Sequence, residues 1–137
     1  MYEKAFQLNI VGPERVVFKG EATSLSAPGE VGSFQVLFNH APLLAQLTSG
    51  KLVVKDLAGI DTAYAVGGGF VEVHDNRATV VADSIELPSE IDVTRAEASR
   101  DRAETRIREH APGTDVDRAR ASLARALNRL KIAGRVS

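Results

Sequence analysis

The sequence predicts a β-sandwich or barrel over residues 1–88, followed by an antiparallel two-helix hairpin over residues 89–137. Two observations lead to this β + α fold class. Up to Pro88, short apolar runs alternate with Gly, Pro and Asn, a spacing typical of sandwiches and barrels. Between Pro88 and Pro112 the chain is rich in Ala, Arg and Glu and contains no Gly or Pro, which favours helix.

The charge distribution changes at the same point. Of the 17 Lys and Arg, six precede Asp92, whereas eleven of the 18 acidic residues do so. The net charge of −1 therefore combines a first part of about −5 with a second part of about +4. A strand-rich body with a basic helical arm suggests a protein that holds one partner and contacts another, and it argues against a pocket enzyme.

Seven apolar stretches of the first part are expected to form strands, because they alternate or are rich in Val and are bounded by turn residues. They span residues 6–10, 16–18, 34–38, 52–54, 63–66, 69–73 and 78–82. Asp75-Asn76 suits a hairpin turn. The run Gly67-Gly68-Gly69 lacks the Lys-Ser/Thr and the helix of a phosphate loop, so we expect close backbone packing there. We expect no internal repeat.

Both helices have recognisable ends. Pro88 disfavours helix in the residue before it, and Asp92 is a good N-cap for a first helix that reaches about Glu109. Residues 110–114 form a turn, and either Asp115 or Asp117 caps a second helix that runs to about Ala133.

The seam between the helices is narrow and rich in alanine. The second helix offers Val116, Ala119, Leu123, Ala126 or Leu127, and Leu130, and the first offers mainly Ala96, Ala103 and Ile107. At about 25 cal/mol per Å² such a seam gains only a few kcal/mol. We therefore expect a marginally stable, movable arm.

The composition excludes several kinds of site. The chain has no cysteine, and the contexts of His40, His74 and His110 give no metal-ligand spacing, so neither a catalytic nor a metal site is expected. The near-neutral charge argues against nucleic-acid binding by the body. No apolar run approaches the ~20 residues of a membrane span, and the first residues do not resemble a signal peptide, so we expect a cytosolic protein.

Four arginines form the strongest candidate for a binding site. Arg125 and Arg129 are spaced i, i+4, and Arg95 and Arg102 are spaced i, i+7, so each pair shares a helix face. A closed hairpin would let the four converge on one anion. The alternative is a solvated surface in which the interleaved acids Glu97, Asp101, Glu104 and Glu109 form salt bridges.

Six ordered stretches together make the chain resemble the epsilon subunits of F-type ATP synthases over essentially its full length. These stretches are residues 10–21, 39–45, 65–73, 80–83, 91–96 and 123–130. The resemblance implies a ten-stranded β-sandwich over 1–88, which docks on the gamma subunit and the c-ring, and a regulatory hairpin over 89–137. It implies no active site and no required cofactor. It also implies a peripheral position on the cytoplasmic face of the plasma membrane, within the complex.

In that family the subunit couples proton-driven rotation to ATP synthesis and often restrains ATP hydrolysis. Its hairpin extends toward the catalytic alpha and beta subunits, and in some members the folded hairpin binds regulatory ATP through an Ile/Leu-Asp-x-x-Arg-Ala motif. The matching residues here, with the further arginines of the family, are Ile91, Asp92, Arg95, Ala96, Arg102, Arg125 and Arg129.

The resemblance also places a contact with the c-ring or the gamma subunit at Gly32, Ser33 and His40. Ser33 is a departure, since the family often carries at that position a Glu that meets the ring. Two alternatives stay open. One is a purely structural coupling or assembly subunit without nucleotide sensing, and the other is an unrelated sugar- or peptide-binding sandwich with a dimerising hairpin.

Overall fold

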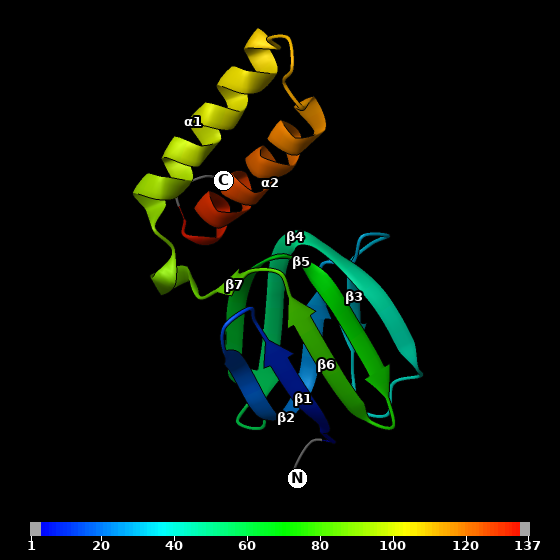
Figure 1. The fold of residues 1–137 in the computed structure, drawn as a ribbon. Helices are drawn as coiled ribbons and strands as arrows, with labels where there is room; N and C mark the ends of the chain where they lie inside the picture. The colour runs from blue at the N-terminus through cyan, green and yellow to red at the C-terminus, as the bar shows by residue number, and fades with distance from the viewer. Residues whose placement is uncertain (1–3, 135–137) are drawn as a thin grey trace. The chain divides into compact units, whose positions relative to one another are not determined.

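The computed structural model describes residues 4–134 and divides the chain between Glu86 and Leu87, next to Pro88 (Figure 1). The first unit contains the β-strands and the second contains the helices. The strands are β1 (Phe6–Val11), β2 (Val16–Ala27), β3 (Phe34–Val36), β4 (Leu43–Asp56), β5 (Asp61–His74), β6 (Arg77–Ala82) and β7 (Ile85–Glu86).

The strands close into a flattened barrel. Hydrogen bonding runs in the order β1-β6-β5-β4-β2, and β2 returns to pair with β1, so the order of strands closes on itself. Pairing is antiparallel except between β1 and β6, which run parallel. The short strands β3 and β7 attach to β2 and β5. The predicted combination of a β-sandwich or barrel with a helical hairpin is confirmed.

The described residues form seven strands where ten were expected, and three of the seven, β2, β4 and β5, are 12 to 14 residues long. The first half of β2 pairs with β1, and its second half pairs with β3 and β4. The N-terminal part of β5 pairs with β7, and its C-terminal part pairs with β6. The two predicted strands at residues 63–66 and 69–73 are therefore one continuous strand, β5.

The glycine run in β5 confirms the expectation of close backbone packing. Gly69 has φ +123°, and a Cβ there would collide with the carbonyl oxygen of Val81 and lie 2.9 Å from Cα of Ala82. Only glycine lets β5 approach β6 at this bend. The turn that joins the same two strands is at Asp75 and Asn76, which both have positive φ (50° and 56°), as the sequence predicted for a hairpin.

Alternating inward side chains of the barrel form its core. Phe6, Leu8 and Ile10 on β1 are at most 2% exposed, and Val71 on β5 and Val80 on β6 are fully buried. The period-2 pattern of β1 therefore predicted its buried face correctly.

The second unit starts with a 3₁₀ turn, η1 (Pro88–Glu90), and continues with α1 (Val93–Glu109) and α2 (Val116–Ile132). The two helices run antiparallel (Figure 1). Asp92 caps α1 by accepting a hydrogen bond from the Arg95 amide at 3.0 Å. Asp115 accepts one from the Arg118 amide at the same distance, so it is Asp115 that caps α2.

The helix seam is as narrow as the sequence indicated. Ala96 and Ala103 are the buried residues of α1, and Ala119, Ala126 and Leu130 are those of α2. Four of the five are alanines, so the helices have little apolar area to bury against each other. The self-packing of the hairpin is correspondingly weak.

Candidate functional site

Six arginines lie beside the seam of the hairpin, and we call them the arginine flank. Each directly precedes a seam residue, so each points about 100° to the same side of it. On α1 the residues Arg95, Arg102 and Arg106 precede Ala96, Ala103 and Ile107, and on α2 the residues Arg118, Arg125 and Arg129 precede Ala119, Ala126 and Leu130.

Both sets lie on the same side of the hairpin. The axes of the two antiparallel helices define a plane, and the hairpin has one face on each side of it. The two-fold axis that exchanges the helices is perpendicular to this plane, so the rotation keeps each face of the hairpin on its own side. Side chains with the same angular offset from the seam on both helices therefore meet on one side. The sequence-predicted arginines Arg95, Arg102, Arg125 and Arg129 belong to this single flank.

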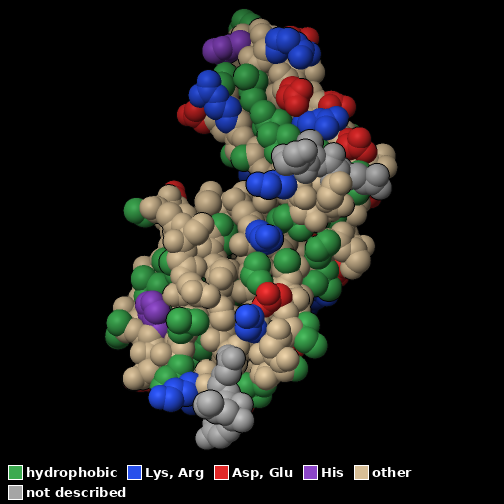
Figure 2. Space-filling view, turned by 180° about the vertical axis from the view of Figure 1, so that it is seen from behind, with side chains coloured by type: hydrophobic (Ala, Val, Ile, Leu, Met, Phe, Trp, Pro, Cys, Tyr) green, Lys and Arg blue, Asp and Glu red, His purple; other side chains and the backbone are tan. Residues whose placement is uncertain are grey.

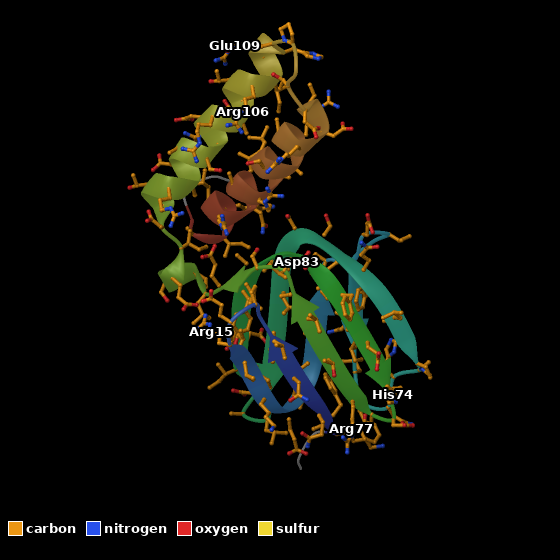
Figure 3. All side chains as sticks on the ribbon, viewed as in Figure 1. Arg15, His74, Arg77, Asp83, Arg106 and Glu109 are labelled. Carbon is orange, nitrogen blue, oxygen red and sulfur yellow. The ribbon has the colours of Figure 1, made fainter. Side chains whose placement is uncertain are left out.

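The antiparallel arrangement also sets which arginines lie level with one another. Because α1 and α2 both have 17 residues and are joined by a short turn, the start of α1 lies opposite the end of α2. By this alignment Arg95 lies about one residue from the level of Arg129, and Arg102 lies about two residues from the level of Arg125. Arg106 lies level with Arg118 near the turn, and Figure 3 shows Arg106 in the half of α1 nearer that turn. The flank is thus three successive arginine pairs along about 16 Å, at 1.5 Å per residue.

The flank is largely available to a ligand. The side chains of Arg95, Arg102 and Arg125 are exposed and form no hydrogen bond or ion pair with other described residues. Two of the four acids of α1 are engaged by Arg100, which lies off the flank, bonds to Asp101 at 3.1 Å and approaches Glu104 at 3.9 Å. The salt-bridge alternative therefore does not account for these three arginines.

The remaining sequence-predicted residues gather at the start of α1. Ile91 is 8% exposed, Ala96 is 3% exposed, and the Asp92 carboxylate is the helix cap. Arg129 is half-buried at the end of α2, which lies beside the start of α1 in the antiparallel pair. A buried apolar residue, a helix N-terminus and two level arginines therefore meet at this end. Such a set can hold a phosphate-bearing ligand with an apolar part.

The expectation of no internal repeat is wrong. When the two helices are aligned by their caps, residues 92–108 match residues 115–131 at nine of 17 positions, with an offset of 23. The shared pattern is Asp-Val-x-Arg-Ala-x-Ala-Ser-x-x-Arg-Ala-x-x-Arg. The repeat was missed because, apart from Val93 and Val116, its constant positions are polar residues and alanines, whereas the leucine and isoleucine positions differ. Aligning the two N-caps would have found it, and with it the flank members Arg106 and Arg118.

A second candidate surface lies on the barrel. A hollow of about 580 Å³ is lined by residues of β4 and β5 together with Asp83. Leu44 and Phe70 border it and are 72% and 44% exposed, although outward positions of a solvated strand are usually polar. Seen from behind, the surface in Figure 2 shows further hydrophobic side chains exposed at several places among polar ones. Exposed apolar side chains around a hollow are typical of a protein-docking surface.

The structure separates the three residues proposed to contact the ring or the gamma subunit. Gly32 and Ser33 lie exposed before β3, whereas His40 follows that strand. The Nδ1 atom of His40 lies 2.7 Å from the carbonyl oxygen of Ala41. The neighbouring amide of Asn39 donates to Asn76, so this loop lies against the β5–β6 turn. Gly32 and Ser33 are therefore one surface feature and His40 is another.

Within residues 4–134, no group of three or more His, Cys, Asp and Glu side chains could hold a metal ion. None of the helices in this range is long and apolar enough to cross a membrane.

Comparisons with known proteins identify the family. Residues 5–88 match the ATP synthase delta/epsilon chain β-sandwich domain, and residues 89–134 match the long α-helix domain of the same chain. A protein of Moorella thermoacetica named ATP synthase epsilon chain is 44% identical over 132 residues, which cover 96% of this chain and 98% of that protein. The chain belongs to the ATP synthase delta/epsilon family. An epsilon chain of Symbiobacterium thermophilum is 45% identical and covers 93% of this chain and 91% of its own length.

Membership of the delta/epsilon family makes the chain a subunit of ATP synthase. Two solved structures share the fold. One is the Euglena gracilis mitochondrial ATP synthase, OSCP/F1/c-ring, with a TM-score of 0.70, 18% identity, and coverage of 98% of this chain and 81% of the other. The second is the central stalk and c-ring of the Tetrahymena thermophila mitochondrial enzyme, with a TM-score of 0.65, 14% identity, and coverage of 97% and 99%.

Proposed function

We propose that this chain is a central-stalk subunit that couples proton-driven rotation to ATP synthesis and restrains ATP hydrolysis through its hairpin. The barrel docks on the gamma subunit and the c-ring, and the extended hairpin approaches the catalytic alpha and beta subunits. The subunit is not itself catalytic, and it lies at the cytoplasmic face of the plasma membrane as part of the complex. Family membership supports the assembly role, and the hairpin chemistry supports the regulatory role.

The regulatory part of the proposal rests on the arginine flank. Six cations on one side of a weakly packed hairpin repel one another, at a few tenths of a kcal/mol for each close pair. A polyanion that binds between them removes this repulsion and favours the closed hairpin. Because a ligand shifts a two-state equilibrium by its differential affinity, ATP would hold the hairpin folded. Low ATP would release it to extend and slow hydrolysis.

The ATP site is proposed at the start of α1. The Arg95 and Arg129 side chains face the phosphates there, and Arg102 and Arg125 follow along the flank. The buried Ile91 side chain provides an apolar contact for the base, and Ala96 leaves room beside the seam. Asp92 holds the helix start in place through its cap to the Arg95 amide.

An ATP titration of the isolated chain tests nucleotide binding. Arg125→Ala should lower the affinity for ATP about tenfold or more, since a charge-assisted hydrogen bond contributes roughly 1.5–3 kcal/mol. Arg120→Ala is the matched control, because Arg120 is an exposed arginine of the same helix on the other side of the seam. Equal affinity of wild type and Arg125→Ala would rule out this ATP site.

The docking part of the proposal is supported by the apolar hollow at Leu44 and Phe70 and by the exposed loop that carries Gly32 and Ser33. That hollow also favours the second candidate function, a purely structural coupling subunit, because docking there needs no nucleotide. Deleting residues 92–137 separates the two functions in the reconstituted complex. A brake predicts raised ATP hydrolysis with assembly intact, whereas a stabiliser predicts loss of assembly.

A further inference from the structure

A pocket of about 480 Å³ lies at the turn end of the hairpin, away from the Asp92 end. It is lined by Arg106, Gly113, Thr114, Asp115, Arg118 and Ala119. The two arginines come from different helices, so residues of both α1 and α2 line one hollow. We propose that this pocket is a second anion site of the hairpin, which binds a phosphate group between Arg106 and Arg118.

Both arginines are available for such a ligand. The side chains of Arg106 and Arg118 are exposed, and neither forms a hydrogen bond or an ion pair with other residues in the range 4–134. The guanidinium group presents several N–H donors in a planar fork that matches phosphate oxygens, so two of them can hold one phosphate group from two sides. The Thr114 hydroxyl adds a donor at the pocket wall.

The internal repeat relates this pocket to the proposed ATP site. A shift of 23 residues between the helices converts the pocket lining into Arg129, Glu90, Ile91, Asp92, Arg95 and Ala96. Five of these six belong to the sequence-predicted ATP-binding set. Each end of the hairpin therefore presents an Asp helix cap, an alanine and two arginines, one from each helix. The two-fold exchange of α1 and α2 relates one end to the other.

The differences between the two ends define the ligand class at the turn. Thr114 stands where the Asp92 end has the buried Ile91, so the turn lacks the apolar contact for a nucleotide base. Gly113 stands where the other end has the acidic Glu90, so the lining of the turn pocket has one acidic residue fewer. The Asp115 carboxylate is engaged as the helix cap by the Arg118 amide. The ligand is thus a phosphate group, from inorganic phosphate or from the tail of a nucleotide.

The inference does not depend on ATP binding at the Asp92 end, because different residues report on each end. Inorganic phosphate and ATP would be titrated separately into the full-length chain, with sodium chloride at matched ionic strength as the blank. NMR signals of the Arg106 and Arg118 Nε–H groups and of the Gly113 and Thr114 amides report on the turn. Saturable shifts of these signals with phosphate, absent with chloride, are expected.

Variants assign the binding to the two arginines. Arg106→Gln and Arg118→Gln should each lower the affinity for phosphate at the turn about tenfold or more. Arg120→Gln, on the opposite side of α2, should leave the affinity unchanged, and Arg95→Gln should change signals at the start of α1 only. Circular dichroism confirms that each variant stays helical.

Each outcome decides the proposal. Shifts at the turn with ATP but not with phosphate would support the site and identify a nucleotide tail as the source. The absence of saturable shifts with either ligand at millimolar concentration would overturn it. Equal weakening by Arg120→Gln would also overturn it, since the effect would then reflect the general positive charge of the helix.

Discussion

Leu130→Ala tests whether one side chain holds the hairpin closed. Leu130 is 1% exposed and is the one large fully buried side chain of the described hairpin, whose other buried seam positions are alanines. The change removes apolar groups worth about 2–3 kcal/mol of transfer free energy. With the cavity left behind, the total cost is about 3–4 kcal/mol. That cost is similar to the whole self-packing energy of the seam.

Leu130→Ala should therefore open the hairpin while the barrel stays folded, because the barrel has its own core. Urea unfolding followed by NMR measures this, since amides of α1 and α2 and amides of the barrel are read separately. Leu127→Ala is the matched control, because Leu127 lies on the same helix and is 40% exposed. That variant should cost only about 1 kcal/mol.

Two results would refute this reasoning. Equal destabilisation by Leu130→Ala and Leu127→Ala would mean that the seam does not carry the stability of the hairpin. Loss of the barrel signals at the same urea concentration would mean that the two units unfold together. If the closed hairpin is the form that binds ATP, Leu130→Ala should also weaken ATP binding, because the apparent Kd is the intrinsic Kd divided by the fraction of chains that are closed.

Three further predictions concern the rest of the chain. Gly69→Ala should destabilise the barrel by about 2–4 kcal/mol in urea unfolding. Gly59→Ala is the control, because Gly59 also has positive φ but has open space around it, and it should cost only about 1 kcal/mol. Similar costs for the two variants would contradict the clash with β6. Asp92→Ala and Asp115→Ala should each lower the thermal stability of the hairpin by about 1 kcal/mol, because their cap geometries match, and Asn at either position should largely preserve it. Deleting residues 92–137 should leave the NMR spectrum of the barrel dispersed, and a collapsed spectrum would show that its core is incomplete alone.

Features that depend on neighbours in the chain could be predicted from the sequence. Asp92 fixes the start of α1 by capping an amide three residues away, and Asp75-Asn76 forms the β5–β6 turn because both residues tolerate positive φ. The arginine spacing is also local, because a helix converts sequence intervals directly into angles. The repeat was equally present in the sequence, but it becomes visible only when the two helices are aligned by their caps.

The candidate sites were predicted only in part. Four members of the arginine flank were predicted from their spacing, whereas Arg106 and Arg118 become evident only when the two helices are aligned by their caps. The barrel hollow at Leu44 and Phe70 was also missed. Apolar residues in a strand look alike in the sequence whether they face the core or solvent, and only the register of β4 with β5 places these two outward.

The sequence by itself determined the order of strands and helices, the cap of α1, the turn residues and the charge of the hairpin, since each follows from residues close together in the chain. Only the tertiary structure decided that β2, β4 and β5 are continuous, that β1 pairs in parallel with β6, and that arginines from two helices share one pocket. These features join residues far apart in the chain. They are fixed when the barrel closes and the helices pack, a choice that no local pattern encodes.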